Sequence, residues 1–161
     1  MGAGAFLWAN STNPRTLLLL GPVLFLRMAL NAIDGMLARE FNQKTPLGAI
    51  LNELCDVISD TALYLPLGLG WGLSPILVIL VVILGIISEM AGVLGVMVGS
   101  SRRYDGPMGK SDRAFVFGAT GLAIGYGAPT GIWETGMLCA MLIMLVATTG
   151  NRARMALRES N

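Results

Sequence analysis

Long apolar runs interrupted by few charges are the feature that most restricts the fold of this chain. Of its 161 residues, 54% are apolar and 13% are charged, whereas a soluble domain carries about 25% charged residues. A run of about 20 apolar residues is long enough to cross a bilayer as a helix. Glycine, with 21 residues, is abundant enough for close helix packing in a membrane. The sequence therefore predicts an integral membrane protein built from helices.

The apolar runs divide the chain into five expected spans. We predict an all-α, polytopic transmembrane helical bundle in which residues 1–161 form a single membrane-embedded domain. The expected spans are 16–38, 47–69, 73–98, 113–126 and 132–149. Pro66 is expected to bend the far end of the second span, and the polar tail 151–161 can continue as a surface helix.

Basic residues are distributed unevenly between the two ends of these spans. Nine of the eleven Lys and Arg residues fall at one end: Arg39, Lys44, Arg102, Arg103, Lys110, Arg113, Arg152, Arg154 and Arg158. Because cytoplasmic loops carry an excess of Lys and Arg, we expect this end to face the cytoplasm, with the protein in a bacterial inner membrane. The net charge of +1 predicts no basic surface for nucleic acid.

Four polar side chains at helical spacing lie near the basic end of the first two spans. Asn31 and Asp34 share a face of the first span, while Asn52 and Asp56 share a face of the second. If the two helices are antiparallel neighbours, Asp34 lies level with Asn52, and Asn31 lies nearly level with Asp56. Each of these two layers then offers one carboxylate and one carboxamide oxygen, which are ligands that Mg²⁺ and Mn²⁺ accept. The chain has no histidine to serve as a metal ligand or general base.

The spacing of these residues resembles the signature of the CDP-alcohol phosphotransferase family. That signature has the form DxxDGxxAR, eight residues, then GxxxDxxxD, and this chain has NAIDGMLAR, eight residues, then GAILNELCD. The matching positions are Asp34, Gly35, Ala38, Arg39, Gly48 and Asp56. Asn31 and Asn52 replace the first and third aspartates. The surrounding spans agree with the membrane bundle of the family.

The resemblance implies an activity in phospholipid biosynthesis. A substituted phosphate group would pass from a CDP-alcohol, expected to be CDP-diacylglycerol, to an acceptor alcohol, and CMP would leave. The resemblance implies a pair of Mg²⁺ or Mn²⁺ ions on the pyrophosphate, with Asp34 and Asp56 as ligands and Asn31 and Asn52 as neutral oxygen ligands. Asp56 stands where the family has its general base. Glycerol phosphate, inositol phosphate, serine and other acceptor alcohols all remain open.

The resemblance also implies a set of substrate-binding residues. The small residues at the matched positions would let the nucleotide approach closely, with a basic side chain beside it: Gly35, Ala38, Gly48 and Arg39. The basic loop and the residues after it are expected to hold a phosphate-bearing acceptor: Arg102, Arg103, Lys110 and Arg113. A simpler interpretation is that these four residues set the topology and meet anionic lipid headgroups.

Two departures from the family pattern keep alternatives open. The two carboxamides reduce the charge of the motif from −4 to −2, which allows a catalytically silent relative or a non-catalytic membrane partner subunit. Family members have six spans, so residues 1–10 resemble the end of a first span. We expect the chain to begin upstream, and a five-span protein completed by another subunit is the alternative. The oligomeric state is open, with a homodimer as one arrangement.

Arg27 lies deep within the first span, seven residues before Asp34. An unpaired arginine at such a depth is costly in a membrane. We therefore predict an ion pair between Arg27 and Asp60, Glu89 or both, which would make Asp60 a structural residue rather than a metal ligand.

Overall fold

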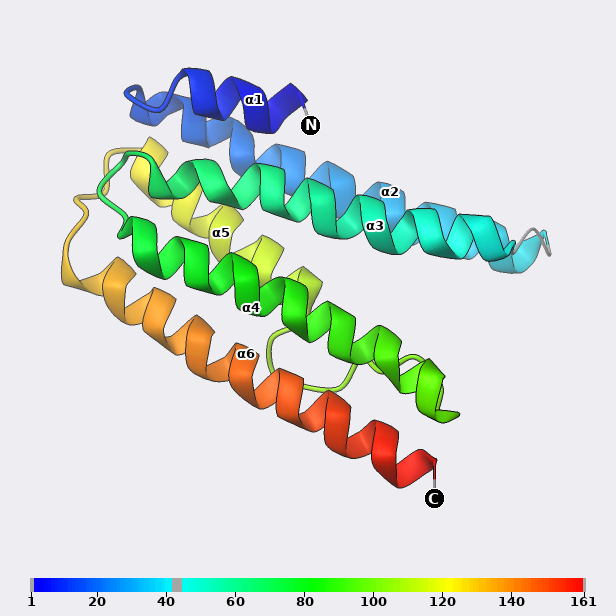
Figure 1. Ribbon diagram of the computed structural model, residues 1–161. Coiled ribbons are helices and arrows are strands. Elements are labelled where there is room, and N and C mark those ends of the chain that lie inside the picture. Colours follow the sequence, from blue (N-terminus) through cyan, green and yellow to red (C-terminus); the bar gives the residue numbers. More distant parts are fainter. Residues whose placement is uncertain (1, 42–44, 161) are drawn as a thin grey trace.

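The computed structural model describes residues 2–41 and 45–160, and within these ranges every regular element is a helix. In chain order the elements are α1 (Gly2–Ala9), η1 (Pro14–Leu19), α2 (Leu20–Glu40), α3 (Pro46–Tyr64), η2 (Leu65–Gly68), α4 (Pro75–Leu94), η3 (Gly95–Val98), α5 (Lys110–Gly125) and α6 (Ile132–Glu159), where η marks a short 3₁₀ helix. Figure 1 shows the long helices alternating in direction, with α3, α4 and α6 in front of α2 and α5. The predicted all-α bundle is confirmed.

Proline and its preceding residue set several helix boundaries. Thr45 precedes Pro46, and its Oγ1 accepts a hydrogen bond from the Gly48 backbone N–H at 3.0 Å. Proline suits the first helical position because its missing N–H would have no intrahelical partner there. At the far end, α3 stops at Tyr64 and Pro66 lies in the 3₁₀ helix η2, so the regular α-helix ends before the proline. The bend expected there stays a prediction.

Within residues 2–41 and 45–160, three helical segments are long and apolar enough to cross a membrane: Pro14–Leu37, Pro75–Val98 and Ile132–Glu159. The chain is thus an integral membrane protein by length and composition of its helices. The predicted second and fourth spans coincide with α3, which carries three acidic residues, and with α5, which has 16 residues. The total of five spans stays a prediction. The tail continues as a helix as expected, since α6 extends to Glu159, but Arg152 and Ala156 are buried, so this segment is not wholly a surface helix.

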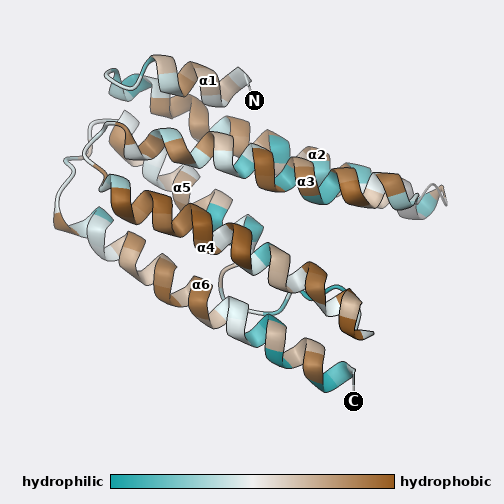
Figure 2. Cartoon of the chain, in the orientation of Figure 1, coloured by the Kyte–Doolittle hydropathy of each residue, from teal (hydrophilic) through white to brown (hydrophobic). Residues whose placement is uncertain are grey.

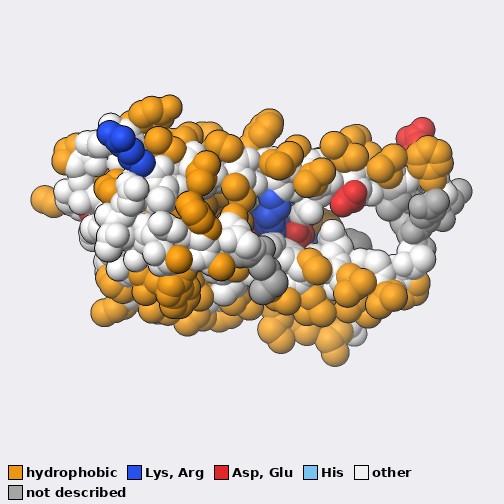
Figure 3. All heavy atoms as spheres, turned by 90° about the horizontal axis from the view of Figure 1, so that it is seen from above, with side chains coloured by type: hydrophobic (Ala, Val, Ile, Leu, Met, Phe, Trp, Pro, Cys, Tyr) orange, Lys and Arg blue, Asp and Glu red, His pale blue; other side chains and the backbone are white. Residues whose placement is uncertain are grey.

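Large apolar side chains cover much of the outer surface. Phe25 is 76% exposed and Ile143 is 71% exposed. Figures 2 and 3 show apolar residues along the outer faces of the helices, while polar residues gather near the middle and one end of the bundle. Such extensive apolar exposure would be a liability in water, but it suits a surface that faces lipid.

The helices pack in pairs that are not neighbours in the sequence. α4 lies along α6, and α2 lies along α5, whereas α2 and α3 each pack more closely against other helices than against each other. A Cβ on Gly121 of α5 would lie 3.0 Å from Leu20 Cδ2, so glycine allows the close contact between these two helices. Tyr64 of α3 stacks on Phe117 of α5, with ring centroids 4.5 Å apart.

Small residues on α4 allow other parts of the chain to approach its backbone. A Cβ on Gly92 would lie 2.5 Å from the Arg103 carbonyl oxygen. The Arg103 backbone N–H in turn donates to the Gly92 carbonyl oxygen at 3.0 Å. The loop that carries Arg102 and Arg103 is thus held directly against α4.

This contact predicts that Gly92→Ala lowers stability. The new methyl group would force the loop away from α4, and such overpacking costs about 1–3 kcal/mol. Gly136→Ala in α6 is the matched control, because a Cβ there meets nothing within 4 Å. In thermal unfolding of the detergent-solubilised protein, Gly92→Ala should unfold at a lower temperature, and Gly136→Ala should not. Equal unfolding temperatures for the two variants would contradict the close packing of the loop.

Candidate functional site

The side chains of the matched motif lie on α2 and α3, and polar contacts connect these two helices. Asn31 Nδ2 of α2 donates to Asp56 Oδ1 of α3, which confirms that these two residues lie at the same level. Arg27, one turn before Asn31, contacts Asp56 Oδ1 at 3.0 Å and also pairs with Asp60 Oδ1. The predicted pairing of Arg27 with Asp60 is confirmed.

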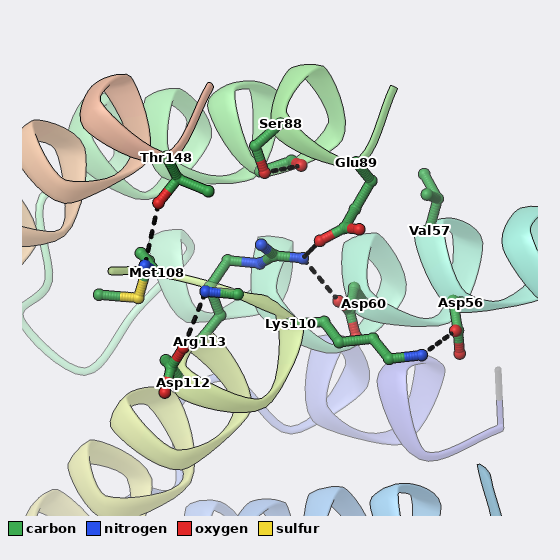
Figure 4. Close-up of polar contacts among 12 residues, drawn as sticks. Asp56, Val57, Asp60, Ser88, Glu89, Met108, Lys110, Asp112, Arg113 and Thr148 are labelled. Atoms are coloured by element: carbon green, nitrogen blue, oxygen red, sulfur yellow. Dashed lines mark hydrogen bonds and ion pairs between the residues drawn. The ribbon is translucent and has the colours of Figure 1, made fainter. Parts of the chain in front are cut away.

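Asp56 lies where α2, α3 and α5 converge. Lys110, the first residue of α5, reaches the carboxylate with Nζ at 2.5 Å from Asp56 Oδ2, as Figure 4 shows. The carboxylate therefore accepts from three side chains, namely Lys110, Arg27 and Asn31. Asp56 is 7% exposed, so these donors replace much of the water that a free carboxylate would bind.

The second predicted layer of the motif, formed by Asp34 and Asn52, is open to the surroundings. Asp34 and Asn52 are both exposed. Figure 3 shows that the molecule is hollowed toward the tip of the α2–α3 pair. A Cβ on Gly35 would meet nothing within 4 Å, and Gly48 is exposed beside the Thr45 hydroxyl. We call Asn31 and Asp56 the inner layer, and Asp34 and Asn52 the outer layer. The expectations for Ala38 and Arg39 fall on side chains outside the described part.

Three arginines surround Glu89 of α4. Arg113 Nη2 of α5 lies 3.0 Å from Glu89 Oε1 and 3.4 Å from Asp60 Oδ2. Arg152 Nη1 of α6 lies 3.2 Å from Glu89 Oε2 and donates to the Ser88 carbonyl oxygen at 2.6 Å. Figure 4 shows Arg113 reaching between Glu89 and Asp60. Glu89 therefore pairs with arginines other than Arg27.

The loop between η3 and α5 carries Arg102, the third arginine at Glu89, and Arg103. Arg102 Nη2 pairs with Glu53 of α3 and lies 3.4 Å from Glu89 Oε2, while its guanidinium carbon is 4.2 Å from the centre of the Tyr104 ring. Arg103 pairs with Asp105 and with Glu159 near the end of α6. The Arg103 guanidinium holds the pKa of the Asp105 carboxyl below its ordinary value.

These contacts join into one ion-pair network. In order of contact its members are Lys110, Asp56, Arg27, Asp60, Arg113 and Glu89. The network branches at Glu89, which also pairs with Arg152 and with Arg102, and Arg102 in turn pairs with Glu53. Of the residues predicted to bind substrate, Lys110 and Arg102 are partly exposed members of the network, with side chains 37% and 18% exposed. Arg113 is buried in its centre, and Arg103 lies outside it. From the sequence, Arg152 was expected only to orient the chain in the membrane.

The inner layer does not fit a divalent metal ion in this arrangement. A carboxylate offers about four lone-pair directions, and three side chains already donate to Asp56. Asn31 contributes its amide N–H₂ to that contact rather than its oxygen. Within the described ranges, no group of three or more acidic or cysteine side chains lies close enough to hold a metal ion. The exposed Asp34 and Asn52 of the outer layer still offer hard oxygen atoms.

A cavity of about 450 Å³ adjoins the inner layer on the side of α1. Apolar side chains form most of its wall, and polar atoms of Arg27, Asn31 and Asp56 lie at its edge. Leu63 and Ile58 of α3 and Val23 of α2 are among the apolar residues that line it. The buried carboxylate is therefore next to space of the size and polarity that suits part of a lipid.

Comparison with known proteins identifies the family of the chain. A model of the CDP-alcohol phosphatidyltransferase family matches residues 2–157. The chain is 48% identical over 150 residues to the inner membrane protein YnbA of Escherichia coli (strain K12), and the matched region covers 93% of this chain and 75% of that protein. No solved structure matches the chain. From the family match and this relative, the chain belongs to the CDP-alcohol phosphatidyltransferase family.

Proposed function

We propose that this protein transfers a substituted phosphate group from a CDP-alcohol to an acceptor alcohol and releases CMP. The donor in this proposal is CDP-diacylglycerol, and the product enters phospholipid biosynthesis. The family implies the reaction class. The observation that carries the proposal is the position of Asp56, a buried carboxylate that three donors hold in place beside a cavity.

Asp56 is the general base in this proposal. Of its roughly four lone-pair directions, three receive hydrogen bonds from Lys110, Arg27 and Asn31. The remaining direction can accept the hydroxyl proton of the acceptor alcohol. As that proton passes to Asp56, the hydroxyl oxygen forms a bond to the β-phosphorus. The bond between this phosphorus and the oxygen that links it to CMP then breaks, and CMP leaves with the electron pair.

Lys110 and Arg102 supply the positive charge that phosphoryl transfer requires. Lys110 has three N–H donors, so its half-exposed ammonium group can contact a phosphate oxygen while it contacts Asp56. Arg102 uses Nη2 for Glu53 and Glu89, and its Nε and Nη1 have no hydrogen-bond partner among the described residues. Both nitrogens are buried, so the guanidinium must turn outward before they can donate to the phosphate of the donor or of the acceptor. Arg113 is a positioning residue, because it holds Asp60 and Glu89 within the bundle.

The family generally uses divalent metal ions. We assign a Mg²⁺ or Mn²⁺ ion to the outer layer, where the exposed Asp34 and Asn52 offer one carboxylate and one carboxamide oxygen. When bound, the ion would neutralise charge on the pyrophosphate. The open space at Gly35 and the exposed Gly48 leave room for the nucleotide next to this layer.

The site faces the cytoplasm in this proposal, and the protein crosses the inner membrane with five spans. Support comes from the helix ends in Figure 1, where the end of α2, the start of α3 and the end of α6 lie on the same side of the bundle. That side carries most of the basic residues. The related E. coli protein is named an inner membrane protein.

Removal of the base tests the activity. Asp56→Asn should lower the rate of CMP release from CDP-diacylglycerol by about 10²–10⁴-fold, the usual contribution of a general base. Release of labelled CMP by purified protein is measured with Mg²⁺ or Mn²⁺ and a panel of acceptor alcohols. Asp112→Asn is the matched control. Asp112, the third residue of α5, accepts the Gly109 N–H with its side chain, and the amide oxygen of asparagine can accept the same hydrogen bond. Unchanged turnover in Asp56→Asn would refute the role of Asp56. Absence of turnover in the wild type with every acceptor would favour the silent relative.

The topology can be tested separately by cysteine labelling. In a protein with Cys55 and Cys139 replaced by serine, a cysteine at position 111 or at position 12 provides a single labelling site. Ser111 in the first turn of α5 and Thr12 in the connection between α1 and η1 are both exposed, and the proposed topology puts them on opposite sides of the membrane. A membrane-impermeant maleimide added to intact cells should label Thr12→Cys but not Ser111→Cys, and permeabilised cells should show labelling of both. The reverse pattern would place the site outside the cytoplasm.

A further inference from the structure

Side-chain cations surround the carboxylate at which the family resemblance places a metal ion. Asp56 Oδ2 contacts the Lys110 ammonium group at 2.5 Å, and Asp56 Oδ1 contacts the Arg27 guanidinium at 3.0 Å. The two cations come from different helices, α5 and α2, and approach different oxygens of the same carboxylate (Figure 4 shows the Lys110 contact). The charge of Asp56 is therefore compensated by the protein itself.

The replacement of aspartate by asparagine at position 31 belongs to the same arrangement. Asn31 donates an amide hydrogen to Asp56 Oδ1. An ionised aspartate at this position has no hydrogen to donate, and its charge would repel Asp56 unless a cation lay between them. The asparagine thus joins the two helices directly, in a position where a metal ion would otherwise have to link two carboxylates.

The charge balance of the ion-pair network also opposes a metal ion in the inner layer. The network contains five cationic side chains, Arg27, Arg102, Lys110, Arg113 and Arg152, and four carboxylates, Glu53, Asp56, Asp60 and Glu89. A divalent ion at Asp56 would add two positive charges to a group that is already positive. Like charges in a partly buried site repel more strongly than they do in water.

We propose that Lys110 and Arg27 take the place of one ion of the metal pair, so that each chain binds at most one divalent ion. This inference rests on the proposed function for its choice of ligand and deepens it. The ammonium group of Lys110 compensates the phosphate charge from the inner layer, and the single metal ion binds at the outer layer. Arg27 keeps Asp56 compensated when Lys110 turns toward the substrate, because it is anchored by Asp60 and by the Asp56 carbonyl oxygen.

The number of bound ions tests the inference without any measurement of turnover. Purified wild-type protein in detergent is equilibrated with Mn²⁺ in the presence of CDP, and bound Mn²⁺ is counted by electron paramagnetic resonance after correction for a sample of CDP without protein. We expect at most one bound Mn²⁺ per chain. Two ions per chain in the wild type would overturn the inference.

A double variant tests the roles of the two inner-layer donors. Lys110→Gln combined with Asn31→Asp removes the ammonium group and one donor, and supplies a second carboxylate beside Asp56. This variant should bind one more Mn²⁺ than the wild type. Arg15→Gln, a charge removal at an exposed position in η1 at the other end of the bundle, should leave the number of ions unchanged. Gel filtration and thermal unfolding establish that each variant is folded.

The outcomes separate this inference from the proposed function. A folded double variant that binds no additional ion would overturn the inference, whatever its activity. A wild type that binds two ions and releases CMP would overturn the inference and retain the function. A wild type that binds at most one ion, with a gain in the double variant but no CMP release, would retain the inference and refute the function. If the double variant does not fold, the count for the wild type decides alone.

Discussion

The ion-pair network is the interaction on which the arrangement of the helices depends. It takes side chains from α2, α3, α4, α5 and α6 and from the loop before α5. Charged groups that leave water must be paired, since removal of one partner from a buried pair typically costs about 3–5 kcal/mol. Only a narrow set of helix positions brings these side chains together. The network therefore specifies how the five long helices are placed, while apolar contacts with their weak directionality fill the space between them.

The backbone of the bundle is shaped to admit this network. Long arginine side chains need room between helices, and small residues on α4 provide it. A Cβ on Gly85 would lie 3.3 Å from Arg113 Nε, and one on Gly92 would lie 3.5 Å from Arg152 Nη1. Glu89 lies between these two glycines, on the same side of α4. The glycines thus serve polar contacts here, in addition to the close helix packing that membrane proteins often achieve with small residues.

Much of the fold follows from the apolar pattern, but the site follows from it only in part. The sequence predicted the helix segments and the alternation of their directions, because these depend on local periodicity. It also predicted the pairing of Arg27 with Asp60, because a lone buried charge is costly. The level contact between Asn31 and Asp56 followed from counting residues on both sides of a short connection. These predictions needed no knowledge of how distant segments pack.

The remaining features depend on distant contacts that spacing does not reveal. α2 and α3 pack against other helices, and so Asp34 and Asn52 are exposed rather than paired. Arg152 looked like one basic residue of a polar tail, yet it is 1% exposed and bonds to Ser88, 64 residues earlier in the chain. Its role could be recognised only once α6 was placed along α4. The asparagine at position 31 likewise looked like a neutral oxygen ligand for a metal ion, whereas in the structure its amide group donates to Asp56. Because Asn31, Arg27 and Lys110 all serve one carboxylate, these three positions are not free to vary independently during evolution. An aspartate at position 31 would be tolerated only together with a change that withdraws a side-chain cation or admits a metal ion. A mutational path between a site compensated by side chains and a site compensated by a metal ion must therefore pass through less stable intermediates, unless both changes occur together.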